Sequence, residues 1–294
     1  MSIEITTAFV EQYSANVQHL SQQKGSRLRR TVDMETVRGK NTFFEQIGAT
    51  TARKRTSRHS DTPRMDTPHA RRRVSLVDYD WADLIDNEDR VRMLIDPTSP
   101  YSLAAANAMG RAMDDAIIDA ADGTAFTGVA GGTSTSFDST NMQVGVQVGG
   151  SSTDVGLNVE KLRAAKENLD SQEVDESDPR FCIVNAKQLR NLLAETEVTS
   201  SDFNSVKALV QGEVNSFMGF DFVRTERIDA DSNADHKVLY YAKTGIKLAI
   251  GLNPTARISE RSDKNYATQV FYSMAIGATR MEEVKVGRIL CDPT

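Results

Sequence analysis

The stretch from Ser99 to Gly123, SPYSLAAANAMGRAMDDAIIDAADG, restricts the fold more than any other part of the chain. Ser99 is a suitable N-cap, Pro100 is tolerated in the first helical turn, and Gly123 readily enters the left-handed conformation that ends a helix. Apolar residues recur at intervals of three or four from Leu103 to Ala121, which predicts one continuous apolar face. The stretch therefore predicts a helix about 35 Å long, around which other elements must pack.

Charge is divided unevenly along the chain. The 294 residues carry a net charge of −6 at pH 7. The window from Lys24 to Arg73 holds fourteen basic and five acidic residues, a net charge of +9, so the other residues carry −15. A basic segment attached to an acidic body predicts a chain that binds copies of itself.

Length and hydropathy limit the class of protein. The chain is long enough for one large domain or two ordinary ones. No apolar run approaches the eighteen residues of a membrane span, and the N-terminus lacks the basic start of a secretory signal. The two cysteines, Cys182 and Cys291, are far apart in sequence and do not suggest a disulfide framework, which fits a reducing cytoplasm.

The basic segment predicts an arm followed by a hairpin. Residues 1–36 predict an extended or partly helical arm, and residues 37–80 predict a long β-hairpin around the turn-rich HSDTPRMDTPHA. An isolated two-stranded ribbon is marginal in water, so we expect the hairpin to dock on the acidic part of an identical subunit. A solvated basic loop is the alternative. The residues expected to make the contact are Arg53, Lys54, Arg55, Arg58, Arg71, Arg72 and Arg73.

Carboxylates are crowded between Asp78 and Asp89. They lack the glycine and the spacing of a calcium loop, so an exposed or arginine-paired acidic face is predicted rather than a metal site. Further acidic residues lie on the predicted helix. The residues expected to receive the hairpin of an adjacent subunit are Asp78, Asp80, Asp83, Asp86, Asp114 and Asp115.

The remainder alternates between helix and strand patterns. Residues 123–157 are rich in glycine but hold no Lys or Arg, which argues against a phosphate-binding loop and favours a flexible loop with a short hairpin. Helices are predicted after Asn158, over AKQLRNLLAET and over SDFNSVKALVQGEV, and Gly219 is predicted at a strand bulge. The segment from residue 256 to the end predicts a β-rich return to the domain that holds the long helix.

Motifs for catalysis are absent from the sequence. No H-E-x-x-H, C-x-x-C, G-x-S-x-G or G-x-x-x-x-G-K-[ST] pattern occurs, and the four histidines are scattered. We therefore predict no catalytic residue, no metal site and no cofactor.

The order of these parts resembles the major capsid proteins of tailed bacteriophages, which share the α+β fold of the Hong Kong 97 type. The closing FYSMAIGATRMEEVKVGRI also looks like the last strands of podovirus-like capsid proteins. The resemblance implies five parts: an N-terminal arm at 1–36, an E-loop hairpin at 37–80, a P-domain at 81–122 with its spine helix at 99–122, an A-domain at 123–255 and a β-rich return to the P-domain at 256–294. Some such capsids are cross-linked through an E-loop lysine, but no cross-link is inferred here.

The resemblance also implies a function. The chain is expected to assemble into pentamers and hexamers of an icosahedral shell around double-stranded DNA, in the virion, after assembly in the host cytoplasm. Expected partners are a separate scaffolding protein, a portal and a decoration protein, with no membrane. Nonspecific contact with packaged DNA is expected from Arg27, Arg29 and Arg30.

Three alternatives stay open from the sequence. The first is an encapsulin-type nanocompartment shell, which has the same fold around a protein cargo. The second is a nonspecific nucleic-acid-binding protein that uses the segment from Lys24 to Arg73. The third is an α/β enzyme acting through the domain from Asn158 onward, which would show a deep pocket with perturbed carboxylates.

Overall fold

The computed structural model describes residues 21–58, 61–62, 64–86, 98–150, 152–195, 216–231 and 234–293. The chain divides into two compact units, and α2 (Thr98–Asp122), β12 (Ile246–Arg261) and β13 (Ala267–Arg280) have residues in both. The first unit consists of Met1–Ser26, Asp78–Ala112 and Leu252–Ala275, and the second of Arg27–Val77, Met113–Gly251 and Ile276–Thr294.

The predicted long helix is present as α2, which begins one residue earlier than expected and ends at Asp122. Its buried apolar side chains recur every four residues, at Ala105, Met109, Met113, Ile117 and Ala121. Leu103 was expected on this face but is 50% exposed. The reason is phase, because two residues along a helix correspond to a rotation of about 200°, so Leu103 lies nearly opposite Ala105.

A close backbone contact in the first unit explains the glycine in the middle of α2. A Cβ added at Gly110 would lie 2.4 Å from the carbonyl carbon of Gly25. The side-chain oxygen of Asn107 accepts a hydrogen bond of 3.0 Å from the Gly25 amide. The helix therefore needs glycine at position 110 for the preceding segment to lie against it.

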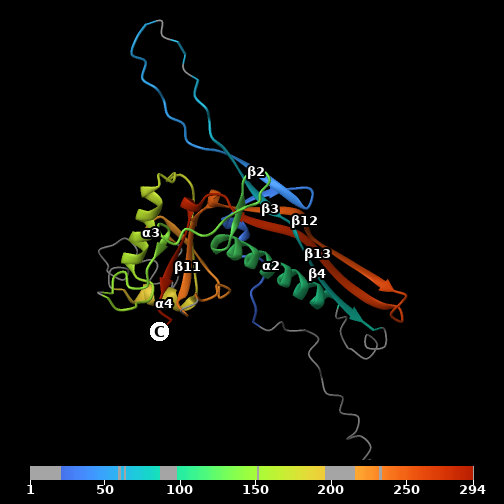
Figure 1. Cartoon of the computed structure of the whole chain (residues 1–294). Helices are drawn as coiled ribbons and strands as arrows, with labels where there is room; N and C mark the ends of the chain where they lie inside the picture. Colours follow the sequence, from blue (N-terminus) through green and yellow to red (C-terminus); the bar gives the residue numbers. More distant parts are fainter. Residues whose placement is uncertain are drawn as a thin grey trace, which may run out of the picture. The chain divides into compact units, whose positions relative to one another are not determined.

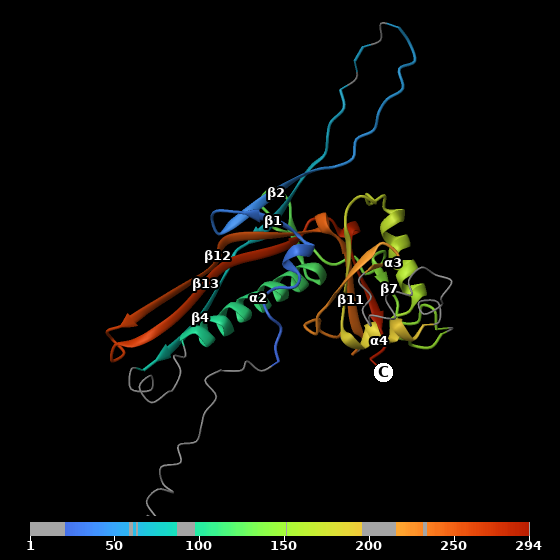
Figure 2. The ribbon, with the colours of Figure 1, turned by 180° about the vertical axis from the view of Figure 1, so that it is seen from behind.

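Long strands run beside the first half of α2. In both views β4 (Val77–Ile85) and the adjoining parts of β12 and β13 lie alongside this half of the helix (Figures 1 and 2). They belong to a four-stranded sheet of order β1-β12-β13-β4. In the second unit, β1 (Asp33–Thr36) pairs in parallel with β12, so the end of the predicted arm forms a strand.

The predicted hairpin is regular only at its base. Strands β2 (Asn41–Ile47) and β3 (His69–Ser75) pair antiparallel over seven residues. Between them the chain leaves the sheet as a long loop, whose described residues have no regular secondary structure (Figure 1). Two strands from the glycine-rich region, β5 (Ala125–Thr127) and β6 (Thr133–Thr135), extend the sheet to the order β2-β3-β5-β6.

A six-stranded sheet forms the centre of the second unit, in the order β7-β14-β11-β8-β10-β9. Helices α3 (Val159–Ser171) and α4 (Ala186–Ala194) lie against it and share one apolar cluster with its strands (Figure 1). The predicted cap Asn158 accepts a hydrogen bond of 2.8 Å from the Lys161 amide. The strands are β7 (Gln143–Val144), β8 (Arg180–Val184), β9 (Ser216–Phe217), β10 (Phe220–Arg224), β11 (His236–Ala242) and β14 (Val286–Cys291).

Two details of the C-terminal half differ from the sequence interpretation. β14 lies between β7 and β11 in the six-stranded sheet rather than beside the long strands of the first unit. Gly219 is not at a bulge, because Met218 (φ 55°) and Gly219 (φ 86°) form the two-residue turn of the β9–β10 hairpin. The helix expected over residues 201–214 lies outside the described residues, as do Glu88 and Asp89.

The described helices include none with the length and hydropathy needed to cross a bilayer. Both cysteines are buried thiols, and burial raises the pKa of Cys291 to about 12. The short 3-10 turns are η2 (Arg29–Thr31), η3 (Lys243–Gly245) and η4 (Glu283–Lys285).

Candidate interaction surfaces

Four of the predicted basic contact residues lie together on the loop between β2 and β3. Arg53, Lys54, Arg55 and Arg58 are all exposed. Arg55 donates a hydrogen bond of 2.9 Å to the carbonyl of Ser57, but none of the four has an acidic partner among the described residues. These four side chains are therefore a concentrated positive charge in the first half of the loop, whereas Arg64, later in the loop, pairs with Asp66 at 3.1 Å.

The other three predicted contact residues, at the base of the hairpin, bind within the chain. Arg71 pairs with Glu45 at 2.7 Å and lies over the ring of Phe43. The guanidinium of Arg73 lies 4.6 Å from the ring centre of Phe126. These two side chains are half-buried on the outer face of the sheet, so they join β3 to its neighbouring strands.

Arg72 is buried and belongs to an internal ionic cluster. It is 8% exposed, donates to the carbonyl of Met281 at 2.7 Å and pairs with Glu283. Its side chain is therefore committed inside the subunit and is not part of a docking surface, which corrects the sequence-based expectation for this residue.

Glu283 also binds Arg280, a fully buried residue that the sequence analysis did not single out. One terminal nitrogen of Arg280 donates to the carbonyls of Ala121 and Gly123, both at 2.9 Å. Arg280 thus satisfies carbonyls at the C-terminal end of α2. Burial, opposed by Glu283, lowers the pKa of Arg280.

Four of the predicted acidic residues lie along or just after β4. Asp78, Asp80, Asp83 and Asp86 are exposed, and none has a cationic partner among the residues that the structure describes. β4 is an end strand of its sheet. The result is an acidic strand edge.

The two predicted contact residues on α2, Asp114 and Asp115, have partners within the chain. Asp114 is fully buried and accepts hydrogen bonds from the backbone amides of Arg27 (3.0 Å) and Leu28 (3.1 Å). The two carboxylate oxygens of Asp115 accept hydrogen bonds of 2.5 Å from Nε and Nη2 of Arg227, and this hydrogen bonding raises the pKa of Arg227. Asp114 therefore anchors the N-terminal segment and is not available to another subunit, contrary to the sequence-based expectation.

The three arginines expected to face DNA lie in or directly after the segment that Asp114 anchors. Arg27, Arg29 and Arg30 are exposed. Arg27 donates to the carbonyl of Arg224 at 2.6 Å, and Arg29 donates to the sulfur of Met34 at 3.4 Å. Arg29 and Arg30 belong to η2.

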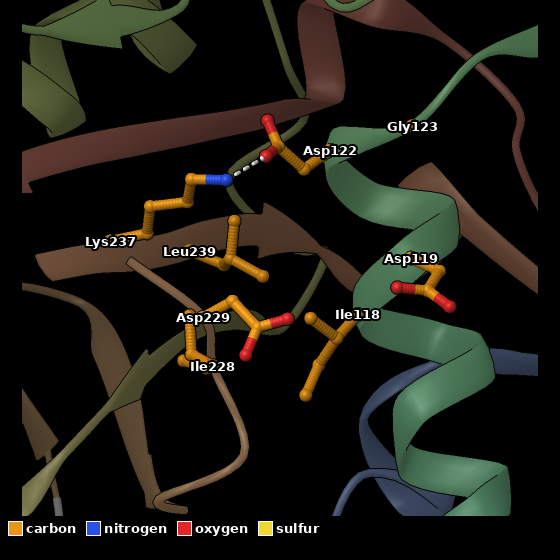
Figure 3. A pocket seen from close by; sticks show the side chains of 8 residues that line it. All are labelled: Ile118, Asp119, Asp122, Gly123, Ile228, Asp229, Lys237 and Leu239. Atoms are coloured by element: carbon orange, nitrogen blue, oxygen red, sulfur yellow. Dashed lines mark hydrogen bonds and ion pairs between the residues drawn. The ribbon is translucent and has the colours of Figure 1, made fainter. Parts of the chain in front are cut away.

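A pocket of about 330 Å³ lies at the C-terminal end of α2 in the second unit. Figure 3 shows Lys237 pointing to Asp122, which it binds at 2.7 Å, and Arg288 binds the same carboxylate at 2.7 Å. Burial, then repulsion from Asp115 and Asp229, raises the pKa of the nearby Asp119. The lining residues are Ile118, Asp119, Asp122, Gly123, Ile228, Asp229, Lys237 and Leu239.

The chemistry of this pocket is that of a structural ion cluster. Asp122 is already neutralised by two cations, and no group of three metal-ligating side chains occurs in the described part of the chain. The pocket has no Ser, Cys or His to act as a nucleophile or base. The carboxylates of this pocket therefore do not indicate a particular catalytic reaction.

Comparison with family models identifies one family over nearly the whole chain. Residues 5–293 match the family model described as phage capsid protein. A search of curated proteins finds no match.

Solved structures with the same fold are phage capsids. The capsid of cyanophage P-SCSP1u matches with a TM-score of 0.76 and 17% identity, covering 99% of this chain and 95% of that one. The capsid of Ralstonia phage GP4 matches with a TM-score of 0.74 and 12% identity, over 97% and 96%. The capsid of cyanophage Pam1 matches with a TM-score of 0.68 and 14% identity, over 97% of both chains.

Proposed function

The chain belongs to the phage capsid protein family, and from this premise we propose how its copies join. It is a capsid shell protein with the Hong Kong 97 type of fold. In the proposal, copies form pentamers and hexamers of an icosahedral head, and the loop of each copy lies over the adjacent subunit of the same ring. Family membership disfavours the encapsulin alternative.

One observation carries the docking proposal. Among its described residues, the same chain exposes four loop cations without an acidic partner and four carboxylates at β4 without a basic partner. The loop cations are Arg53, Lys54, Arg55 and Arg58, and the acids are those of β4 and Asp86. A single exposed ion pair contributes about 0–1 kcal/mol, but each subunit of a shell repeats the whole set.

The test is assembly of the purified protein, observed by negative-stain electron microscopy. Rings and closed shells are expected from the unmodified chain, whereas a small monomer at every concentration would refute the proposal. Reversal of the loop charge, with Arg53→Glu, Lys54→Glu, Arg55→Glu and Arg58→Glu, is expected to leave folded subunits that do not form shells. The matched control replaces the three arginines by lysine, which keeps the charge and is expected to assemble.

A second part of the proposal concerns DNA. We assign nonspecific contact with packaged double-stranded DNA to Arg29 and Arg30, with a smaller share for Arg27, whose guanidinium is held by the Arg224 carbonyl. The logarithm of the DNA-binding constant falls linearly with the logarithm of the salt concentration. Loss of one phosphate contact makes this slope less steep by about one unit. Arg30→Gln is expected to reduce this slope, and an unchanged slope would contradict the assignment.

The remaining expectations follow from family membership. A capsid protein is a component of the virion, and we propose assembly in the host cytoplasm with a scaffolding protein, a portal and a decoration protein as partners. We also propose a purely structural role, without catalysis, metal or cofactor. The ion-paired carboxylate of the pocket at α2 supports this role.

A further inference from the structure

Strand β4 has an open edge. It is an end strand of the order β1-β12-β13-β4, and among the described residues no strand pairs with its other side. Its nine residues are longer than the usual edge strand, and natural proteins rarely leave such an edge unprotected. An open edge offers unpaired amide and carbonyl groups to a further strand.

The side chains of β4 divide between two faces. Tyr79 and Trp81 are half-buried, whereas Asp78 and Asp80 are exposed. Alternate residues of a strand lie on the same face, so the two carboxylates stand side by side on the outer face. Two copies of β4 would place like charges opposite one another, which disfavours pairing of the edge with itself.

The loop between β2 and β3 has the complementary properties. Residues 49–56 are exposed, have no regular secondary structure and make no backbone hydrogen bond to another segment of the described chain. Their sequence, ATTARKRT, contains no proline or glycine, so every amide can donate. Arg53 and Arg55 are two residues apart, as are Asp78 and Asp80.

We propose that residues 52–56 of one copy add to the edge of β4 of a second copy as a β-strand, with Arg53 and Arg55 on the face of Asp78 and Asp80. In an antiparallel pair Arg53 is opposite Asp80 and Arg55 is opposite Asp78. In a parallel pair Arg53 is opposite Asp78 and Arg55 is opposite Asp80. Lys54 then lies on the other face, beside Tyr79. This inference rests on the proposed shell function and adds main-chain hydrogen bonds to its charge pairing.

Hydrogen exchange on the unmodified protein tests the added strand. Alternate amides of residues 52–56 are expected to exchange at least about tenfold more slowly in assembled particles than in free subunits, because an added strand donates every second amide to the edge that it joins. If particles form while these amides exchange at the free rate, strand addition is wrong and the shell function stands. If no particles form at all, the proposed function itself has failed.

Disulfide trapping tests the register. The two native thiols are buried, so introduced cysteines react selectively. Arg53→Cys combined with Asp80→Cys, or with Asp78→Cys, is expected to give a ladder of linked subunits after mild oxidation of particles, since opposite residues fall within disulfide reach. Lys54→Cys with Asp80→Cys is the matched control on the opposite face. Particles that give no ladder with either Arg53 pair would overturn the proposed register.

Discussion

Glu283 is the residue on which two buried cations depend. Its carboxylate binds Arg72 and Arg280, which are 8% and 0% exposed. We predict that Glu283→Gln lowers the free energy of unfolding by about 3 kcal/mol, because removal of one partner leaves buried charge uncompensated. Urea unfolding measures the loss. Glu282→Gln is the neighbouring control, since the more exposed Glu282 only pairs with Lys285 at 3.3 Å, and an equal loss in both variants would contradict the prediction.

Lys161 is a further buried charge, and it joins α3 to β14. Its amino group donates to the carbonyls of Val155 (2.6 Å) and Leu290 (2.9 Å). Lys161→Met leaves both carbonyls without this donor, so a loss of about 1–3 kcal/mol is expected in urea unfolding. Lys166→Met, on the same helix, controls for the methionine and is expected to cost less.

The contribution of Lys161 to folding stability changes with pH in a defined direction. Burial lowers the pKa of Lys161 below its ordinary 10.5, so the unfolded chain binds more protons than the folded one between these two values. Stability attributable to this residue is therefore present above 10.5 and is lost as the pH falls through the folded pKa. The unmodified protein is expected to gain stability relative to Lys161→Met as the pH rises toward 10.5, and parallel pH profiles would contradict this.

At this scale the sequence predicts local partners better than distant ones. Asn158 was identifiable as a cap because its acceptor group and the Lys161 amide are three residues apart. Arg280 was not, because the carbonyls that it binds come from residues more than 150 positions earlier. A charged residue in an apolar pattern signals only that some distant partner must exist.

At the scale of elements, Asp114 determines where the N-terminal segment joins α2. It accepts two backbone amides, those of Arg27 and Leu28. We predict that Asp114→Ala costs about 1–3 kcal/mol and speeds cleavage by trypsin after Arg29 and Arg30, because the amides of Arg27 and Leu28 lose their acceptor and the segment detaches from α2. Thermal unfolding and limited proteolysis measure these effects.

A second acidic residue of the same helix serves as the control. The pKa of Asp119 is raised by burial and by the nearby Asp115 and Asp229, so its negative charge is unfavourable in the folded state. Asp119→Asn is expected to raise the melting temperature slightly at neutral pH and to leave trypsin cleavage unchanged. A fall in melting temperature equal to that of Asp114→Ala would show that the effect is not specific to the anchor.

The elements most readily predicted were those with a strong local pattern. The bounds of α2 followed from Pro100 and Gly123, α3 followed from its cap Asn158, and α4 followed from its sequence pattern without a predicted cap. The extent of the β2–β3 ladder did not follow, because a basic alternating run fits a paired strand and a loop equally well. The place of β14 was missed for a related reason, since strand order depends on long-range pairing that a sequence pattern does not encode.

At the scale of the whole molecule, the proposed docking is directional because the basic loop and the acidic strand are different surfaces of one chain. A loop that binds the next subunit would make a head-to-tail contact, which gives a closed ring when the rotation between successive subunits closes. Reversal of the loop charge (Arg53→Glu with Arg55→Glu) or of the strand charge (Asp78→Arg with Asp80→Arg) puts like charges at every junction. Each variant alone is therefore expected to remain unassembled, and one chain with all four substitutions is expected to form closed shells again.

An equal mixture of the two reversed variants gives the most discriminating result. Attractive junctions then occur only between unlike variants, so subunits must alternate around a ring. A ring of six permits alternation, whereas a ring of five always contains one like-charged junction, which is destabilising. The mixture is expected to form sheets or tubes of hexamers rather than closed shells in negative-stain images. Closed shells from the mixture, or from either variant alone, would show that these charges do not direct ring closure.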